Sequence, residues 1–522
     1  MWKTAKIVIL LVLGAFLAGL LPTLADILDD TVIFSVENGL ALHPKFAAAL
    51  SSVWRAAKDY TWHFTILYAC ILGVIIFMEG QNPDRTILWL LTLVFVPVVG
   101  VILYVIIGPD MHNLRNRRLF KPSRSAGADL SPFTTDRRFL IGKLLHSSCG
   151  AVLTVHNKIT FLINGDETFP ALLRGIRGAE DFIDMQYFII KDDDIGREVR
   201  SALVDAAGRG VKVRVLYDAV GSWGLKPSFF KPLEEVGAEC RSFMPVAFPL
   251  FRRQMNYRNH RKITVIDGRF AFTGGLNLGD EYRGLGPLGF WRDTHVMVEG
   301  EAVAELHSVL LHDWCVRTGD DPDKVCDEEI RGPRDFDELP VLPVQVVSSG
   351  VDNVWHSISQ GYCAMISRAK ERVWITSPYL VPGPNIMAAL ISSALAGVDA
   401  RVLMPARKDH FLVYWGSRGN IEPLLRAGVR VYMYKKGFIH TKSLVADGDI
   451  ASVGTCNMDV RSLEINFETQ LFIYSADMAL KFAEQFEDDL GDAEEIKLES
   501  WEKRPLWQKA LESFGRLYSA QI

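Results

Sequence analysis

Two short stretches of the chain carry the same reactive side chains at the same spacing. Both read His-x-Lys-x4-Asp, and the residues are His260, Lys262 and Asp267 in the first stretch and His440, Lys442 and Asp447 in the second. An imidazole can attack an electrophile or exchange a proton near neutral pH, while an ammonium group holds an anion. The repeated trio therefore indicates chemistry on an anionic group such as a phosphate.

The local sequence predicts how each trio is positioned. "HRKITVID" and "HTKSLVAD" are rich in β-forming residues, and each ends at Asp-Gly, a favoured two-residue hairpin turn. Residues two apart on a strand point to the same side, so each histidine should share a face with its lysine. Asp267 and Asp447 stand at odd spacing and can reach an imidazole N–H only at the strand end or across to the other half. We assign them orienting roles.

Small and amide residues follow each turn. The chain returns to Gly275 in the first stretch and to Thr455 in the second, where small residues let backbone N–H groups approach a phosphate. Asn277 and Asn457 then offer amide donors beside them. We predict that these four residues bind the phosphate of the substrate.

The duplication carries more information than either motif alone. A single match would be interpreted as a surface strand with an Asp-Gly turn, but two matches in register with repeated strands indicate a functional pair. Neither half is a complete catalyst, and a pseudo-twofold pairing would bring both His-Lys pairs to one cleft. There one imidazole can attack phosphorus while the other protonates the leaving alkoxide. The lysines and asparagines would stabilise the charge on the equatorial oxygens.

This chemistry needs neither a metal nor another cofactor, and no cluster in the sequence has convincing metal-ligand spacing. His307 and His312 are interpreted as ordinary residues of a helix. The seven cysteines are scattered and never spaced as Cys-x-x-Cys, which fits reduced thiols in a cytoplasmic location. The formal net charge of -5 provides no global basic surface, so nucleic acid is not the expected partner.

Beyond residue 150 the chain alternates β-rich apolar runs with helical patterns, which indicates an α/β fold. Its two halves can be laid over one another, since residues 180–189 resemble residues 371–380 and each half closes on its His-x-Lys motif. We therefore predict a tandem duplication of one α/β domain with pseudo-twofold symmetry. The expected domains are residues 151–335 and 336–490.

The N-terminal region is apolar. Residues 61–78 and 87–107 are runs close to the roughly 20 residues that a helix needs to cross a bilayer. The loop between them is short and polar, so we predict a transmembrane hairpin over residues 61–107; the alternative is a pair of buried core helices. Residues 1–60 hold a third apolar run, residues 7–25, which is either an uncleaved membrane helix or an interfacial anchor.

Charge at the ends of these runs predicts the orientation. Five basic residues follow the hairpin in a basic linker, residues 108–150, namely Arg115, Arg117, Arg118, Lys121 and Arg124. By the positive-inside rule the large C-terminal portion lies in the cytoplasm of a multi-pass protein of the cell (inner) membrane. The C-terminal segment, residues 491–522, starts a helix after Pro505. Its apolar face either lies on the membrane or docks on the core of the domain.

The paired motifs resemble those of the phospholipase D superfamily over about residues 150–490. The hydrophobic hairpin, the basic stretch and the segments "MNYRNHRKITVIDG", "FWRDTH" and "GFIHTKSLVADG" are closer still to bacterial cardiolipin synthases. The resemblance implies metal-independent transfer of a phosphatidyl group between two phosphatidylglycerol molecules through a phosphatidyl-histidine. It also implies that His260 is the nucleophile and His440 the acid/base, although the sequence itself does not break the symmetry. The extra run at 7–25 departs from the family pattern and bears on topology.

Two further residues belong to the predicted cleft. Glu468, after the second asparagine, resembles a family position near the site, or else is an ordinary glutamate at a sheet edge. Arg292, in "FWRDTH" with Asp293 and His295, either lines the cleft or belongs to a salt-bridged strand.

Two other classes of function compete with the transferase. In a phospholipase D or a related nuclease, water would take the place of the accepting alcohol. In a lipid-binding scaffold the fold would be retained without catalysis, which two intact motifs make a poor explanation. The sequence leaves open the accepting lipid, the acyl chains and the oligomeric state.

Overall fold

The computed structural model describes most of the chain after residue 136 and part of the N-terminal region. The described residues are 137–245, 257–330, 336, 338–350, 353 and 355–519, with 63, 66, 67, 69–74, 76, 77, 83–95, 100 and 104. The chain divides into two compact units: an N-terminal unit, residues 1–109 with 249–253, and a catalytic unit, residues 110–248 with 254–522.

The N-terminal unit contributes helical segments within the predicted hairpin. Residues 69–74 are helical, and α3 (Pro83–Phe95) begins earlier than the predicted second run. In the part of the chain that the structure describes, no helix has both the length and the apolar character to cross a membrane. The run at 7–25 and the basic cluster at 115–124 lie outside the described residues.

The catalytic unit is built on a sheet of 15 strands. The first half provides β1 (Leu153–Ile163), β2 (Phe182–Tyr187), β3 (Lys212–Asp218), β4 (Glu239–Phe243), β5 (Ile263–Ile266), β6 (Phe270–Gly274) and β8 (Thr294–Gly300). The second half provides β9 (Val341–Ser349), β10 (Arg372–Thr376), β12 (Asp399–Pro405), β13 (Arg430–Tyr434), β15 (Ser443–Ala446), β16 (Ile450–Gly454), β18 (Glu468–Ile473) and β19 (Ala493–Ile496).

The strand order repeats about the centre of this sheet. Outward from the centre, the first half runs β1-β8-β6-β5-β2-β3-β4, and the second half runs β9-β18-β16-β15-β10-β12-β13 before it ends at β19. β1 and β9 pair antiparallel at the junction, as expected for two copies related by a twofold axis. The predicted α/β duplication is therefore present, and its two halves share one continuous sheet.

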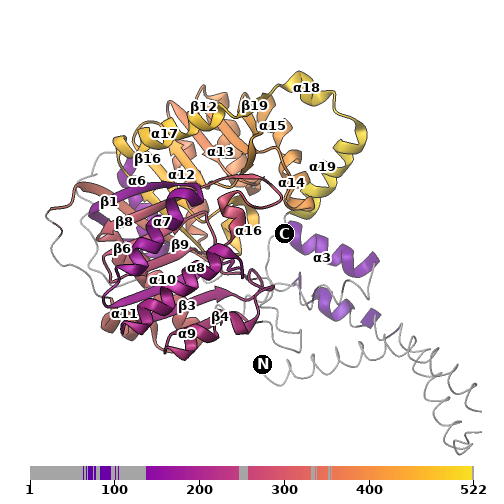
Figure 1. The fold of residues 1–522 in the computed structure, drawn as a ribbon. Helices are drawn as coiled ribbons and strands as arrows, with labels where there is room; N and C mark the ends of the chain where they lie inside the picture. Colours follow the sequence, from indigo (N-terminus) through magenta and orange to yellow (C-terminus); the bar gives the residue numbers. More distant parts are fainter. Residues whose placement is uncertain are drawn as a thin grey trace, which may run out of the picture. The chain divides into compact units, whose positions relative to one another are not determined.

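Helices cover both faces of the sheet (Figure 1). Those before β9 are α6 (Arg137–Cys149), α7 (Asn164–Arg177), α8 (Asp194–Gly208), α9 (Lys231–Glu235), α10 (Ala302–Thr318) and α11 (Pro322–Glu329). Those after it are α12 (Ser357–Arg368), α13 (Gly383–Leu395), α14 (Phe411–Gly419), α15 (Ile421–Arg426), α16 (Val460–Glu464), α17 (Ala476–Leu490), α18 (Leu498–Glu502) and α19 (Leu506–Ser519). Short 3-10 turns lie at Pro227–Phe229 and Asp280–Arg283.

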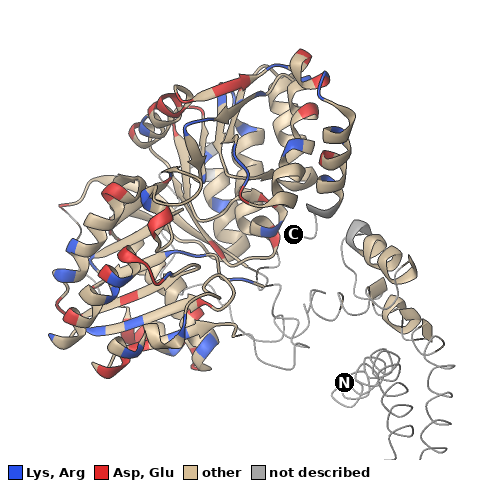
Figure 2. Cartoon of the chain, turned by 45° about the vertical axis from the view of Figure 1, so that its right-hand side comes forward, with Lys and Arg blue, Asp and Glu red and all other residues tan. Residues whose placement is uncertain are grey.

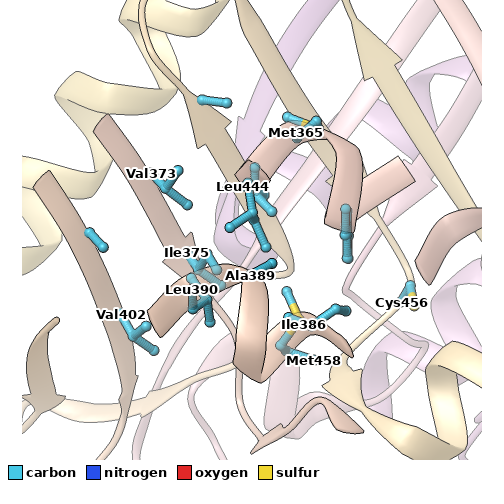
Figure 3. Close-up of a cluster of buried hydrophobic side chains, with 14 of the residues drawn as sticks. Met365, Val373, Ile375, Ile386, Ala389, Leu390, Val402, Leu444, Cys456 and Met458 are labelled. Carbon is cyan, nitrogen blue, oxygen red and sulfur yellow. The ribbon is translucent and has the colours of Figure 1, made fainter. Parts of the chain in front are cut away.

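Separate apolar cores fill the two sides of the sheet. Val373 and Ile375 of β10 face a cluster that α13 also lines (Figure 3), while Trp374 between them faces a different cluster. This alternation follows from the strand period of two. Because both faces are covered by helices, the strands are buried along most of their length, and polar side chains in strands such as β2 and β18 are buried with them. The core under α10 and α17 contains residues of both halves and fastens them together.

Two small ladders lie outside the main sheet. β7 (Phe290–Arg292) pairs parallel with β14 (Gly437–Ile439), and β11 (Leu380–Val381) pairs parallel with β17 (Met458–Asp459). The first ladder joins a segment of the first half to the segment that leads into the second motif. It therefore brings the two halves together next to a predicted catalytic histidine.

The hairpins that follow the motifs differ in detail from the prediction. β5 begins after Lys262, so the His-Lys pair lies in the extended segment before the strand rather than on it. Ile266 pairs with Phe270, so the loop has three residues and not the predicted two. Asp267, its first residue, has a φ of 54°, a left-handed conformation that aspartate tolerates better than most residues. β15 and β16 repeat this arrangement, with Asp447 at a φ of 53°.

The ends of the catalytic unit contain more structure than their sequence suggested. The predicted C-terminal tail, residues 491–522, starts with β19, which pairs with β13, and α6 within the predicted basic linker packs against α12. Basic and acidic side chains are interspersed over both halves (Figure 2). The domain limits 151–335 and 336–490 stay predictions.

Candidate active site

The first motif is held in place by a strand of the second half. Asn259 pairs with Phe467 in an isolated bridge, and the backbone N–H of His260 donates to the carbonyl of Phe467 over 2.9 Å. The next residue, Glu468, begins β18, and its carboxylate lies 2.9–3.0 Å from Nδ1 of His260. Glu468 is fully buried. The predicted cleft position of Glu468 is therefore a contact to the imidazole of the other half.

The second motif repeats this contact in the opposite direction. Ile439 pairs with Arg292 where β14 meets β7, and the N–H of His440 donates to the carbonyl of Arg292 over 2.7 Å. The following residue, Asp293, places its carboxylate 2.8 Å from Nδ1 of His440. Each histidine is thus oriented by a carboxylate that the other half provides.

Both histidines line one cavity of about 310 Å³. Its other lining residues come from both halves and include Phe188, Ile189, Asn277, Glu281, Tyr282, Gly286, Pro287, Leu288, Gly289, Trp291, Tyr379, Asp409, His410 and Asn457. Aromatic rings pack beside the two imidazoles, with Phe188 centred 5.0 Å from His260 and Trp291 centred 5.1 Å from His440. One small cavity therefore receives both imidazoles, as the shared-cleft hypothesis requires.

The protonation states of the pairs follow from burial and charge. Burial lowers the pKa of both His260 and His440 to about 4, against the opposing effect of their carboxylates. Burial by itself would raise the pKa of Glu468 and Asp293, but the neighbouring histidines and lysines outweigh it and lower the pKa of both carboxyls. An ionised carboxylate only accepts hydrogen bonds, so Nδ1 carries the proton in each neutral imidazole. The lone pair then lies on Nε2, the atom a nucleophile or base needs.

The two lysines lie behind the histidines. Lys262 and Lys442 are buried, and each Nζ donates to the backbone carbonyl of its own histidine. Burial lowers the pKa of Lys262 well below its usual value and that of Lys442 to about 8. A bound anion would favour the charged ammonium forms. The lysines are therefore placed to respond electrostatically to a phosphate in the cavity.

The predicted phosphate-binding residues divide into two groups. Asn277 and Asn457 line the cavity, and within the described part of the chain the carboxamide oxygen of Asn457 has no hydrogen-bond partner. The backbone N–H groups of Gly275 and Thr455 are instead taken by strand carbonyls, those of Thr294 and Thr469. The prediction that these two N–H groups bind phosphate is therefore wrong.

Gly275 and Thr455 serve the orienting carboxylates instead. A Cβ on Gly275 would lie 2.0 Å from Oδ1 of Asp293, so only glycine leaves room for that carboxylate. Thr455 donates its hydroxyl to Oε2 of Glu468. Both residues support a carboxylate in its position next to an imidazole.

The prediction that Asp267 and Asp447 orient the imidazoles is also wrong. The carboxylate of Asp267 accepts the backbone N–H groups of Glu180, Asp181 and Phe182 over 2.8–3.0 Å. Asp447 accepts those of residues 370–372 in the same way. The two aspartates fasten the hairpin turns to the start of the neighbouring strand. Their proximity to the histidines in sequence does not persist in space, because the strand carries them to its far end.

The guanidinium of Arg292 points away from the cavity. Its Nε donates to Asp489 of α17 over 2.6 Å, and the side chain is buried. The side chain of Arg292 therefore fits the alternative prediction, a salt-bridged strand. Its backbone carbonyl accepts the N–H of His440. His307 likewise has an ordinary role, since its Nε2 lies 2.7 Å from the buried Asp184. No cluster of ligands suited to a metal ion is found within the described residues.

Sequence reasoning missed a polar pair on the cavity wall. Tyr379 donates its hydroxyl to Asp409, and both line the cavity. Tyr379 lies in the repeated segment 371–380 and Asp409 lies in a loop, and neither residue belongs to one of the two motifs. Asp293 was named together with Arg292 as a possible cleft residue, and the strand register shows that it occupies the place in the first half that Glu468 occupies in the second.

The chain resembles known proteins over most of its length. A family model described as "Cardiolipin synthase, PLD-like domain" matches residues 172–308 and 362–490. The cardiolipin synthase 2 of Bacillus cereus is 40% identical over 472 residues, which cover 86% of this chain and 89% of the relative. The major cardiolipin synthase of Bacillus subtilis is 38% identical, with 87% and 97% of the two chains covered.

The chain belongs to the cardiolipin synthase family. These matches confirm the predicted family and support cardiolipin synthesis by a phosphatidyltransferase. A second family model, "Phospholipase_D-nuclease N-terminal", matches residues 66–109, within the predicted hairpin and two residues beyond it. The crystal structure of a phosphatidylserine synthase from Haemophilus influenzae superposes with a TM-score of 0.57 at 13% identity. It covers 73% of this chain and all of the other, and this likeness concerns the fold alone.

Proposed function

We propose that this cardiolipin synthase family member transfers the phosphatidyl group of one phosphatidylglycerol to another, and that both histidines act on one phosphodiester. The observation that carries the proposal is the single cavity that receives His260 and His440. Each imidazole has its Nδ1 on a carboxylate, which leaves Nε2 for the substrate. A binding scaffold would have no use for two imidazoles prepared in this way.

In the first step Nε2 of His260 attacks phosphorus. A P–N bond forms, the P–O bond to the glycerol headgroup breaks, and protonated His440 gives its proton to the departing oxygen. The anionic phosphodiester itself favours a proton on His440, because opposite charges raise the pKa of a base. We assign His260 as the nucleophile because the resemblance implies it. In the substrate-free cavity the two imidazoles have similar contacts and similar pKa values.

In the second step His440 acts as a base. It takes the proton from a free hydroxyl of the second phosphatidylglycerol, whose oxygen attacks phosphorus as the P–N bond breaks. The products are cardiolipin and, from the first step, glycerol. Lys262, Lys442, Asn277 and Asn457 stabilise the charge on the phosphoryl oxygens in both steps.

The lining of the cavity supports a lipid substrate. Phe188, Ile189, Pro287, Leu288 and Trp291 form an apolar wall beside the polar groups. Such a wall favours an alcohol that arrives attached to a lipid over water. Basic and acidic residues are interspersed along the described part of the catalytic unit (Figure 2), and this mixture does not favour a nucleic acid as substrate.

We further infer that the protein is a multi-pass protein of the cell membrane with its catalytic unit in the cytoplasm. Described helical residues of the N-terminal unit expose large apolar side chains, among them Leu67, Val74, Phe77, Val94 and Phe95. An aqueous surface of that kind is unfavourable. Protease added to spheroplasts should spare a C-terminal tag, and cleavage of the tag before lysis would refute this orientation.

The reaction is tested with labelled phosphatidylglycerol. Purified protein in detergent is incubated with the lipid in the presence of a chelator, and the products are separated. We expect cardiolipin and glycerol in equal amounts. Phosphatidic acid as the only labelled product would identify a hydrolase instead, in which water resolves the intermediate.

A further inference from the structure

The C-terminal helix α19 is amphipathic, but it faces the wrong way for a helix that docks on a protein core. Its buried positions are Glu512 and Gly515, whereas Trp507, Phe514 and Leu517 are about half exposed. These three and Leu506, which is 82% exposed, lie within about 100° of one another around the helix axis and so share one face. An ordinary surface helix would bury this apolar stripe and expose the glutamate.

Ion pairs and close backbone contacts fix α19 in this orientation. The buried carboxylate of Glu512 accepts from Arg418 over 3.2 Å and from Arg504 over 2.7 Å. A Cβ on Gly515 would lie 2.5 Å from the backbone nitrogen of Gly416 in α14, so the two helices touch at glycines. Rolling α19 to bury its stripe would break both ion pairs and leave charges unpaired, which is costly. These contacts therefore keep the apolar stripe of α19 on the outer side of the helix.

The partner helix α14 extends the same apolar surface. It begins with the residues Phe411, Leu412, Val413, Tyr414 and Trp415, and none of these five is buried. Trp415 contacts Trp507 edge-on with ring centroids 6.0 Å apart, so the exposed residues of α14 and the stripe of α19 are continuous. The two helices lie side by side at one side of the catalytic unit (Figure 1). We call this surface the α14–α19 face.

The α14–α19 face adjoins the catalytic cavity. His410, the residue that precedes α14, lines the cavity together with Asp409. Two exposed basic residues, Arg407 and Lys408, lie just before them. An apolar surface with basic residues beside it suits the boundary between anionic headgroups and acyl chains.

We propose that the α14–α19 face docks on the lipid bilayer and holds the mouth of the cavity at the level of the headgroups. This inference rests on the proposed function, because it explains how a lipid phosphodiester reaches His260 without leaving the membrane. Exposed tryptophan and phenylalanine would enter the acyl boundary, and the neighbouring arginine and lysine would meet anionic headgroups.

Photocrosslinking tests the occupant of this face. In the full chain, reconstituted in phosphatidylglycerol vesicles, Phe514 is replaced by p-benzoylphenylalanine and the sample is irradiated. Leu480 of α17 is the matched control, since it is 56% exposed and no residue of α17 lines the cavity. We expect lipid adducts at position 514 and none at 480. Adducts only to residues 1–109, or only to a second copy, would overturn the proposal.

A kinetic test separates failure of this proposal from failure of the proposed function. The variant Trp507→Ser/Phe514→Ser is compared with the parent on vesicles and on a short-chain phosphatidylglycerol that is monomeric in solution. We expect activity on vesicles to fall about tenfold, because the variant loses two aromatic side chains that would insert into the bilayer, with activity on the soluble lipid unchanged. Unchanged activity on vesicles, or equal loss on both lipids, would overturn the docking role. A parent that makes no cardiolipin from either lipid would instead refute the proposed function.

Discussion

The two half-sites reach the same geometry with different residues. At His440 the orienting group is the shorter Asp293, held by the backbone N–H of Thr294 over 2.8 Å and accommodated by Gly275. At His260 it is the longer Glu468, held by the hydroxyl of Thr455. Each solution matches the length of its carboxylate. The halves have therefore diverged around a shared requirement, an anion on Nδ1 of each imidazole.

Each histidine is oriented by a carboxylate of the other half, which explains why the site needs both halves. His260 depends on β18 of the second half, and His440 depends on the segment after β7 of the first half. Because each histidine is oriented across the junction, neither half contains a complete imidazole-carboxylate pair. Variants that weaken one half-site at a time can therefore separate what both half-sites need for catalysis from what only one of them needs.

The largest effect should come from either histidine. We expect His260→Ala and His440→Ala each to reduce cardiolipin synthesis by at least about 1,000-fold, because each removes a group that forms bonds or transfers protons. Initial rates on labelled phosphatidylglycerol measure the loss. Circular dichroism checks that each variant is folded. Substantial activity in either variant would contradict a cavity shared by two imidazoles.

Neutralising an orienting carboxylate should have the next largest effect. Glu468→Gln and Asp293→Asn keep the shape of the side chain but remove its charge, so the imidazolium that forms during the reaction loses its counter-charge. We expect kcat to fall about 100-fold with little change in KM in both variants. The double variant should show whether the effects combine. If KM rises and kcat stays constant, the carboxylates bind substrate and do not position the histidines.

The pH profile tests whether the half-sites are alike in protonation. The first step needs a neutral His260 and a protonated His440, and both imidazoles have a pKa of about 4. We therefore expect kcat/KM to rise as the pH falls from 8 towards 4, by up to about tenfold per pH unit, because more of the free enzyme carries the proton on His440. Below about pH 4 it should decrease, because Nε2 of His260 is protonated as well, and above pH 8 its fall with rising pH should steepen as Lys442 loses its charge. An acid limb near 6.5, the ordinary histidine value, would mean that burial does not control these groups.

The residues behind the carboxylates should show the divergence of the half-sites. In Gly275→Ala the added methyl group must displace Asp293, so we expect about a tenfold loss of kcat. In Thr455→Ala, Glu468 loses one hydrogen bond but keeps its space, and we expect about a threefold loss. Rates of the two purified variants measured side by side give the ratio. A larger loss in Thr455→Ala would reverse our account of the two supports.

Much of the fold could be predicted from the sequence, because strand periodicity and repeated segments are local signals. The duplication places corresponding strands in corresponding positions, and the reactive histidines and lysines were found from the repeat. The orienting role of Glu468 and Asp293, which the sequence indicated only as residues near the cleft, could not be found in this way. Asp267 and Asp447 are near the histidines in sequence, but an extended strand separates them, whereas Glu468 and Asp293 meet the histidines only through pairing between the halves.

Backbone donors raised a similar difficulty. Gly275 and Thr455 looked like a phosphate cradle, since small residues permit close approach. Their N–H groups are consumed by the sheet, a fact that depends on which strand lies alongside. The outward stripe of α19 was equally hidden, because an amphipathic pattern does not tell which face meets the protein.

The roles of the two histidines can be tested with a phosphatidyl ester of p-nitrophenol, whose leaving group needs no proton. In His440→Ala, Nε2 of His260 can still attack, but no base remains to activate the accepting alcohol. We therefore expect a burst of about one nitrophenolate per chain and a phosphatidyl adduct on His260 by mass spectrometry. His260→Ala should give neither. A burst in His260→Ala, or an adduct on His440, would contradict the assignment of one nucleophile and one acid/base to this cavity.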